Sequence, residues 1–353
     1  MTFAGLAFLS PSQFNIYRQC PRRLSYDRHV RAEGPRRARP AADLGTVAHL
    51  CLERLVKTGT LWSPDVAGAI GQAWDETARA TLGDAAESTP GHDLVRARLP
   101  NAVAALLKLV PGPDGVLAEQ WVASRDGLLQ GKIDLLCERP GGWLLVDYKS
   151  TLSRDFDTGE LHVNDYERQL RLYAHIVADS TGVLVSRAVL LALDGSAVEV
   201  DIEAGRVADV AGEARAAHVA FNGAGPGDPP ATPAEHACRF CDHHARCPEF
   251  WASCGPAWAL LSAAAGTVAA IQVIPATGVS LSLDVVAGTV PAGRVALTRV
   301  PLANLPALDE LQPGSWVAVT GLRPRPGGGA YWLPDWGRVA VVRSAIAIGL
   351  SRT

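Results

Sequence analysis

The hydrophobic pattern up to residue 221 predicts a mixed α/β domain. Helices are expected over residues 10–20, 43–57, 64–82, 92–110, 165–179 and 207–221. Strands are expected over residues 117–124, 128–138, 143–149, 185–193 and 197–202. Because Asp126-Gly127 and Gly141-Gly142 are turn sequences, the first three strands are expected to form an antiparallel meander.

The pattern changes after Ala265, where short apolar strands replace the longer helical segments. Strands are expected over residues 267–274, 280–286, 294–300, 315–322 and 331–342, with a short helix near 302–311. Five strands with a helix between the third and the fourth match the element order of an OB-type barrel, although a small barrel of another topology would show similar alternation. The sequence therefore predicts two domains, residues 1–258 and residues 265–353.

Composition narrows the class of protein. A hydrophobic content of 48% with 20% charged residues is ordinary for a soluble globular protein. No apolar run approaches the ~20 residues that cross a bilayer, and the N-terminus lacks the basic region of a signal peptide. A cytoplasmic protein without membrane contact is therefore expected. In such a protein, seven cysteines favour metal or cluster ligation over disulfides.

The net charge of −3 does not indicate nucleic acid, but the distribution of charge does. A short N-terminal segment with only two acidic residues, Asp27 and Glu33, contains eight arginines: Arg18, Arg22, Arg23, Arg28, Arg31, Arg36, Arg37 and Arg39. A run of this kind is more often a solvated surface than a binding site. Its place between a candidate cluster ligand and a candidate metal ligand favours a surface that binds the phosphate backbone of a nucleic acid.

Two aspartates and a lysine fall on neighbouring predicted strands, in Gly131-Lys-Ile-Asp134 and Asp147-Tyr-Lys149. Antiparallel neighbours lie ~4.8 Å apart, so Asp134 and Asp147 can reach one hard cation such as Mg²⁺ or Mn²⁺. The strand period of two puts Asp147 and Lys149 on one face. Such a cation polarises a scissile phosphate and acidifies a bound water, while the ammonium offsets developing charge. An isolated D-x-K is usually a surface salt bridge. The upstream Gly131-Lys-Ile-Asp134 makes the motif much more specific for a nuclease centre.

Two predicted helices carry polar residues one turn apart. Gly45, His49 and Glu53 share one helical stripe, and the His49 imidazole is a candidate third ligand of the same ion. A lone helical histidine is more often a partly buried residue. Gln169 and Tyr173 also lie four positions apart, so Gln169 can bond the attacking water or a phosphate, and Tyr173 can stack on the substrate or donate to it. In the alternative interpretation, this second helix only packs on the sheet.

Cys20, Cys238, Cys241 and Cys247 bracket these motifs. Four thiolates hold one iron–sulfur cluster, and they hold one tetrahedral zinc ion equally well. The zinc alternative gains from three nearby histidines, His236, His243 and His244. The spacing of the cysteines leaves both groups open.

As a set, these motifs resemble the iron–sulfur-containing PD-(D/E)XK nucleases of the RecB type, which include CRISPR-associated exonucleases and the AddB nuclease domain. The similarity spans about residues 9–255 and lies in residues 9–23, 45–53, 131–134, 147–149, 169–173 and 238–247. It implies a restriction-endonuclease-like α/β core with a helical N-terminal part. It also implies metal ligation by His49, Asp134 and Asp147, and catalysis by Lys149 together with Gln169 and Tyr173. The four cysteines are expected to bind a [4Fe–4S] cluster that links the first helix to the end of the domain. The C-terminal barrel, which stands in place of a helicase, departs from the family pattern.

The sequence thus predicts a Mg²⁺- or Mn²⁺-dependent DNA nuclease, directed to single strands or DNA ends, in repair, recombination or defence against foreign DNA. The barrel is expected to grip single-stranded DNA, or else to dock a helicase or another DNA-processing protein. Its candidate stacking residues, beside Arg323 and Arg325, are Trp316, Tyr331, Trp332 and Trp336. The alternative is a non-catalytic cluster-containing subunit that binds DNA ends or assembles a larger complex. The complete Asp–Asp–Lys–His set argues against that alternative.

Overall fold

The structure, a computed structural model, describes residues 5–29, 40–150, 164–224, 229–239, 241–274, 278–306, 310–334 and 337–342. The chain divides into two compact units. The first, here called the α/β unit, comprises Gly5–Asn15 and Arg39–Gly223. The second, the C-terminal unit, comprises Met1–Ala4, Ile16–Ala38 and Ala224–Thr353. The division into residues 1–258 and 265–353 stays a prediction.

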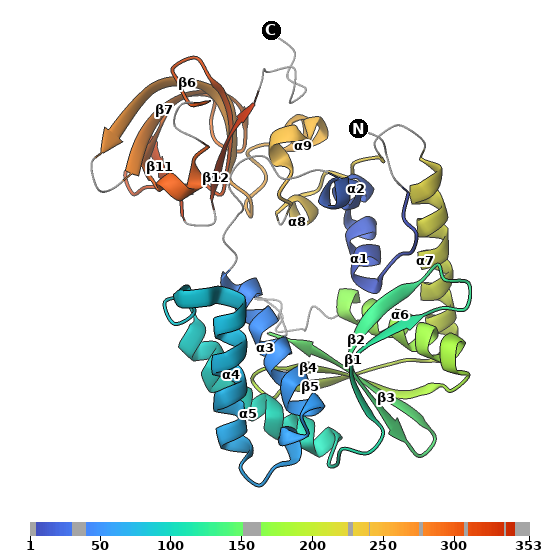
Figure 1. The fold of residues 1–353 in the computed structure, drawn as a ribbon. Coiled ribbons are helices and arrows are strands. Elements are labelled where there is room, and N and C mark those ends of the chain that lie inside the picture. The colour runs from blue at the N-terminus through green and yellow to red at the C-terminus, as the bar shows by residue number, and fades with distance from the viewer. Residues whose placement is uncertain are drawn as a thin grey trace. The chain divides into compact units, whose positions relative to one another are not determined.

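A five-stranded sheet forms the centre of the α/β unit (Figure 1). Its strands, in spatial order, are β1 (Val116–Ala123), β2 (Gln130–Arg139), β3 (Gly142–Lys149), β4 (Val185–Ala192) and β5 (Ala197–Val200). The first three form the expected antiparallel meander. Strand β4 then runs parallel to β3 and antiparallel to β5. A parallel pair needs a crossover connection, and α6 (Asn164–Thr181) lies in that connection.

Helices cover both faces of this sheet. On one face, α3 (Pro40–Lys57), α4 (Val66–Leu82) and α5 (His92–Leu109) build a core with inward side chains of β2, β3 and β4. On the other face, α6 contacts the first four strands and packs against α7 (Ala204–Gly223) (Figure 1). Burial on both faces explains why β3 reads as a nearly continuous apolar run. Within the described part of the chain, no helix is long and apolar enough to cross a membrane.

The N-terminal helices differ from the sequence prediction in one respect. Helix α1 (Pro11–Gln19) was expected, whereas α2 (Pro21–His29) was not. Pro21 begins α2 at a position where the missing N–H costs no helical hydrogen bond. The helix is strongly polar, so it lacks the apolar stripe by which a surface helix is recognised. Two short 3₁₀ turns, η1 (Thr60–Trp62) and η2 (Gly83–Ala85), flank α4.

In the C-terminal unit, short helices precede a seven-stranded sheet. The helical elements are α8 (Glu235–Cys238), η3 (His244–Arg246), α9 (Pro248–Ser253) and η4 (Leu302–Asn304). The strands are β6 (Ala263–Ile274), β7 (Gly278–Gly288), β8 (Gly293–Val300), β9 (Trp316–Thr320), β10 (Arg323–Pro324), β11 (Ala330–Trp332) and β12 (Arg338–Val342). In the range 302–311 the described residues form the η4 turn, Glu310 also has 3₁₀ conformation, and residues 307–309 lie outside the described part of the chain.

The strand order of this sheet is β10-β11-β8-β7-β6-β9-β12. Residues 331–342, expected as one strand, form two strands that pair at different places: β11 runs parallel to β8, and β12 runs antiparallel to β9. Pro334 falls between them, and proline cannot continue a sheet ladder. The short connection from β11 to β12 requires the sheet to curl. Among the described residues the ladder remains open at β10 and β12, so no closed barrel is found.

Candidate active site

The Asp134 carboxylate lies where strands β2 and β3 separate. Their ladder ends at the pair Leu135–Val146, although both strands continue beyond it. Past that point, Asp134 Oδ2 accepts a hydrogen bond from the Tyr148 backbone N–H at 2.7 Å. A side-chain carboxylate thus takes the place of a backbone carbonyl in the ladder. The divergence makes room for polar side chains at the end of an otherwise apolar hairpin.

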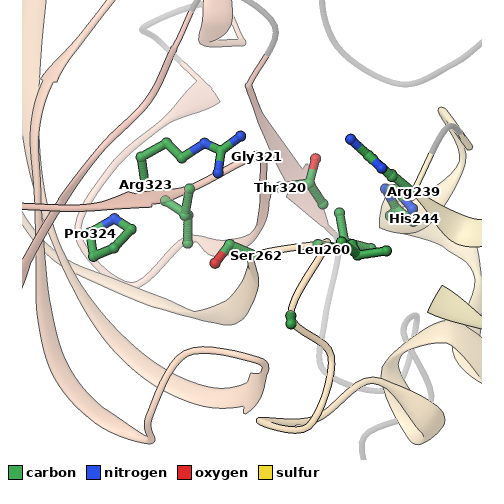
Figure 2. A pocket seen from close by; sticks show the side chains of 11 residues that line it. Arg239, His244, Leu260, Ser262, Thr320, Gly321, Arg323 and Pro324 are labelled. Carbon is green, nitrogen blue, oxygen red and sulfur yellow. The ribbon is translucent and has the colours of Figure 1, made fainter. Parts of the chain in front are cut away.

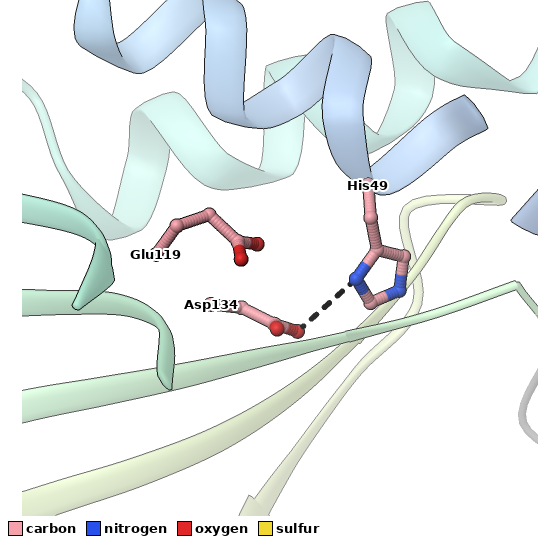
Figure 3. Close-up of side chains that lie close together, drawn as sticks. All are labelled: His49, Glu119 and Asp134. Atoms are coloured by element: carbon pink, nitrogen blue, oxygen red, sulfur yellow. Dashed lines mark ion pairs between the residues drawn. The ribbon is translucent and has the colours of Figure 1, made fainter. Parts of the chain in front are cut away.

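Three potential ligand atoms, one each from His49, Glu119 and Asp134, lie close together (Figure 3). His49 of α3 directs Nδ1 toward Asp134 Oδ2 at 3.5 Å, and Glu119 of β1 points into the same space. One ligand atom from each residue lies within 4.8 Å of the other two. Burial lowers the pKa of His49, but the neighbouring Asp134 carboxylate more than offsets this, so the pKa is raised. The imidazole therefore lies in a field of negative charge.

Glu119 was missed by the sequence analysis. Strand β1 pairs Ala118 with Leu135 and Gln120 with Ile133, so Glu119 stands opposite Asp134. Its φ of 54° lies in the left-handed region that non-glycine residues rarely adopt, and such strain often accompanies functional sites. Burial raises the pKa of Glu119, and the Asp134 carboxylate raises it further. The ion pair with Lys132, at 2.5 Å, lowers this pKa but does not cancel the rise. The only sequence signal was an acidic residue in the strand next to Asp134.

Asp147 and Lys149 form a buried ion pair next to this group. Asp147 is only 4% exposed, and its Oδ2 contacts the Lys149 ammonium. Burial raises the pKa of Asp147, and the attraction of Lys149 opposes that rise. For Lys149, burial lowers the pKa, but the Asp147 carboxylate outweighs burial and the pKa is raised. Lys149 therefore stays protonated at neutral pH.

The two α6 residues singled out by the sequence have different surroundings. Gln169 donates from Nε2 to Asp147 Oδ1 at 3.2 Å, which fixes the orientation of that carboxylate. Tyr173 is 6% exposed and donates its hydroxyl to the Lys132 carbonyl at 2.8 Å. A Cβ on Gly131 would approach the Tyr173 ring to 2.7 Å, so glycine is required there. In this arrangement Tyr173 supports the β2 backbone, and its contact with substrate stays a prediction.

The four cysteines of the predicted cluster line one pocket in the C-terminal unit. Cys20 follows α1, and the other three belong to residues 235–254, here called the cysteine segment. All four are free thiols, and burial raises the pKa of Cys241 to about 12 and that of Cys247 to about 11. A hydrogen bond also joins α2 to the stretch that precedes the cysteine segment: Arg22 Nε donates to the Pro229 carbonyl at 3.0 Å.

Of the basic N-terminal run, four arginines lie among the described residues: Arg18, Arg22, Arg23 and Arg28. Arg22 pairs with Glu249, and Arg23 lies 3.7 Å from Asp27. Both side chains are 14% exposed, so they serve internal contacts rather than an open surface. The other members, Arg31, Arg36, Arg37 and Arg39, lie outside the described residues.

The aromatic residues expected on the C-terminal sheet are not equivalent. Trp316 and Tyr331 are partly buried and pack against hydrophobic clusters. Trp332 is 42% exposed, and Trp336 lies outside the described residues. Arg325 donates from Nε to the Thr298 hydroxyl, whereas the Arg323 side chain is exposed. Trp332 and Arg323 are therefore the accessible members of the predicted set.

Glu119→Gln tests whether this carboxylate belongs to the ligand group. Loss of one supporting carboxylate is expected to weaken Mn²⁺ binding by about 10–100-fold. The affinity can be measured by the paramagnetic signal of free Mn²⁺. Glu199→Gln, which removes an exposed carboxylate paired with Arg187, is the matched control and should leave the affinity unchanged. Equal affinities for the two variants would remove Glu119 from the ligand group.

Of the comparisons with known proteins, the family model agrees with the chemistry of this site. The family model of the PD-(D/E)XK nuclease superfamily matches residues 8–248. Among curated proteins, none matches the chain. One similar solved structure, described as the crystal structure of SSO0001, is 16% identical and covers 65% of this chain and 93% of its own. Its TM-score of 0.25 is too low to support a structural argument.

Proposed function

The chain belongs to the PD-(D/E)XK nuclease superfamily, and on this premise we propose that it is a Mg²⁺- or Mn²⁺-dependent deoxyribonuclease directed to single strands or DNA ends. The observation that carries the proposal is the gathering of His49, Glu119, Asp134, Asp147 and Lys149 from α3 and three adjacent strands. Membership in the superfamily implies metal-dependent nuclease activity. The choice of DNA, and of single strands or ends, goes beyond that membership.

We assign the divalent cation to His49, Asp134 and Asp147, with Glu119 as an additional ligand. Carboxylate oxygens suit Mg²⁺ and Mn²⁺, and a buried cluster of carboxylates needs a compensating positive charge. The raised pKa values of Glu119 and Asp147 reflect that need, because burial and repulsion from the Asp134 carboxylate both disfavour their charged forms. When bound, such an ion polarises the scissile phosphate and acidifies a water molecule.

Lys149 and Gln169 act on the reacting groups through charge and orientation. A protonated Lys149 can donate to the attacking water or to a phosphate oxygen, and it offsets the negative charge that develops at phosphorus. The ion pair with Asp147 favours the protonated form of Lys149, which suits charge stabilisation better than proton abstraction. Gln169 keeps Asp147 turned toward this group of residues.

The four cysteines are proposed to hold a [4Fe–4S] cluster rather than zinc. A tetrahedral zinc site with bonds of ~2.3 Å places neighbouring sulfurs about 3.8 Å apart. Among the described residues, only His49, Glu119 and Asp134 bring three ligand atoms within 4.8 Å of one another, so the cysteine sulfurs are spread more widely. All four cysteines line one pocket, which supports a single shared group, and the resemblance of the motifs favours an iron–sulfur cluster as that group.

We further propose an OB-type arrangement for the C-terminal sheet, with a role in holding single-stranded DNA. The parallel pairing of β8 with β11 and the pairing of β9 with both β6 and β12 support a curled sheet of this type. Docking of a helicase or another DNA-processing protein on this sheet stays a prediction.

Two exposed tryptophans are candidates for base stacking. Trp121 on β1 is 59% exposed and pairs across the ladder with Lys132, while Trp332 on β11 is 42% exposed. Replacing either by alanine is expected to weaken single-strand binding by ~1–3 kcal/mol, and phenylalanine should restore most of that loss. The affinity for a labelled oligothymidylate reports this directly. If both alanine variants bind like the wild-type protein, neither ring stacks on a base.

The substrate class is tested by cleavage of end-labelled single-stranded DNA, blunt duplex DNA, closed circular duplex DNA and single-stranded RNA in Mn²⁺. We expect single strands and free ends to be cut fastest, and closed circles to persist. Fast cutting of closed circles or of RNA alone would contradict the proposed substrate. Tight DNA binding without any cleavage would favour the non-catalytic subunit instead.

A further inference from the structure

A second binding site is suggested by a pocket of about 520 Å³ in the C-terminal unit (Figure 2). One wall consists of residues 259–262, which lead from α9 into β6, and another of residues 320–324, from the end of β9 through β10. Arg239 and His244 of the cysteine segment complete it. Its volume lies within the ~300–1,000 Å³ typical of small-ligand sites.

The lining of this pocket is positively charged. Among the described residues that form it there are two guanidinium groups, those of Arg239 and Arg323, and no carboxylate. Figure 2 shows these side chains on opposite sides of the pocket, with Thr320 between them and Ser262 nearby. Both guanidinium groups have other contacts within the protein, but each carries five N–H donors. Guanidinium and hydroxyl groups around one space are suited to a phosphate.

The walls of the pocket are fixed by contacts that need no ligand. Glu235 Oε1 accepts hydrogen bonds from the backbone N–H groups of Leu260 and Leu261, and Gly321 N–H donates to the Ser262 carbonyl at 2.8 Å. Phe250 and Trp251 of α9 pack in one hydrophobic cluster with residues of β6, β9 and β12. A site that is already formed loses little entropy when it binds.

We propose that this pocket is a phosphate subsite for a single-stranded DNA chain, with Arg239 and Arg323 holding one phosphodiester. The inference rests on the proposed function, from which it takes DNA as the ligand. A free nucleotide offers the same phosphate chemistry. However, the described lining contains no aromatic ring except the buried His244, so nothing there stacks on a base. The chemistry of the lining therefore favours the backbone of a strand.

The subsite shares a wall with the cysteine pocket. His244 lines both, and one of its ring nitrogens, Nε2, lies 2.8 Å from the Cys238 carbonyl oxygen. Arg239 directly follows Cys238 in the chain. A group held by the cysteines, as proposed above, would thus help to place Arg239, one of the two phosphate-binding arginines. Binding must therefore be compared between full-length proteins with equal metal content.

The test compares two double variants of the full-length protein, both made with Lys149→Ala to suppress cleavage. Arg239→Gln/Arg323→Gln removes the two pocket charges, and Arg187→Gln/Arg294→Gln removes two exposed charges elsewhere. With a fluorescein-labelled oligothymidylate, the pocket variant is expected to bind about 10-fold more weakly or worse. Its logarithmic salt dependence should be shallower by about 1. Equal affinities for the two double variants would overturn the proposal.

Competition distinguishes the two sources of phosphate. Unlabelled oligothymidylate is expected to displace the probe, whereas thymidine monophosphate at the same phosphate concentration is not. Equal displacement by the mononucleotide would overturn the assignment to a strand. Cleavage by the protein with Lys149 intact is measured separately. If the protein does not cleave DNA but the two double variants differ in affinity, the nuclease assignment is wrong and the phosphate subsite stands. If it cleaves DNA and the two double variants bind equally, only the subsite is wrong.

Discussion

Lys149→Ala is expected to lower the rate of DNA cleavage by at least about 10²–10³-fold. The side chain places a protonated amine beside Asp147, and the acidic group around Asp134 adjoins this pair. Without it, the negative charge that develops on the phosphate loses a preorganised partner. The fold should tolerate the change, because the pKa of Asp147 is already raised by burial and the carboxyl can take up a proton.

Asp147 calls for a more careful substitution. Asp147→Ala would leave Lys149 as a buried cation without its partner, a loss that typically costs about 3–5 kcal/mol of folding free energy. Asp147→Asn also removes the negative charge, but its amide oxygen can still accept a hydrogen bond from Lys149, so its cost in folding free energy should be smaller than that of alanine. Single-turnover cleavage, DNA affinity and thermal unfolding are measured together. Arg187→Ala, which breaks an exposed ion pair on the adjacent β4, is the control. Wild-type rates in Lys149→Ala or Asp147→Asn would overturn the assignment of the active site.

Loss of the cluster is the second change with a large expected effect. The thiolates would join Cys20 to residues more than two hundred positions later in the chain, and a cross-link that closes so long a loop contributes up to about 5 kcal/mol. Cys20→Ala should therefore lower the unfolding temperature and remove iron and visible absorbance. The unit should not fall apart completely, because Arg22 and Thr232 also connect the two segments by hydrogen bonds.

Cys254→Ala is the matched control for that experiment. Cys254 is a buried free thiol in the same segment, but it does not line the cysteine pocket. This variant should keep its iron and lose only the small packing contribution of the side chain. Stoichiometric zinc without iron, in protein purified anaerobically, would replace the proposed cluster with a zinc site.

The sequence was sufficient to locate the main motifs because they depend on local geometry. A tight hairpin places Asp134 near Asp147, and helical spacing aligns His49 with its neighbours, whatever the rest of the chain does. Family membership and the observed meander agree with those expectations. The roles of the individual residues stay predictions until variants are measured.

What the sequence did not reveal depends on longer-range features. Glu119 stands opposite Asp134 only because of the β1–β2 register and a left-handed backbone at a glutamate, and no local pattern encodes either one. Helix α2 is polar and forms without an apolar stripe. The break between β11 and β12 did have a signal in Pro334, which is incompatible with a continuous central strand.

Metal-dependent cleavage, measured on wild-type and Lys149→Ala proteins purified side by side, tests the central claim most directly. Each protein is incubated with labelled single-stranded DNA in Mn²⁺ or in EDTA, and the parallel variant controls for contaminating nucleases. The proposed function predicts cleavage by the wild-type protein in Mn²⁺, none in EDTA, and cleavage at least about 10²–10³-fold slower by Lys149→Ala. Equal cleavage by both proteins, or none by the wild type in Mn²⁺, would contradict it.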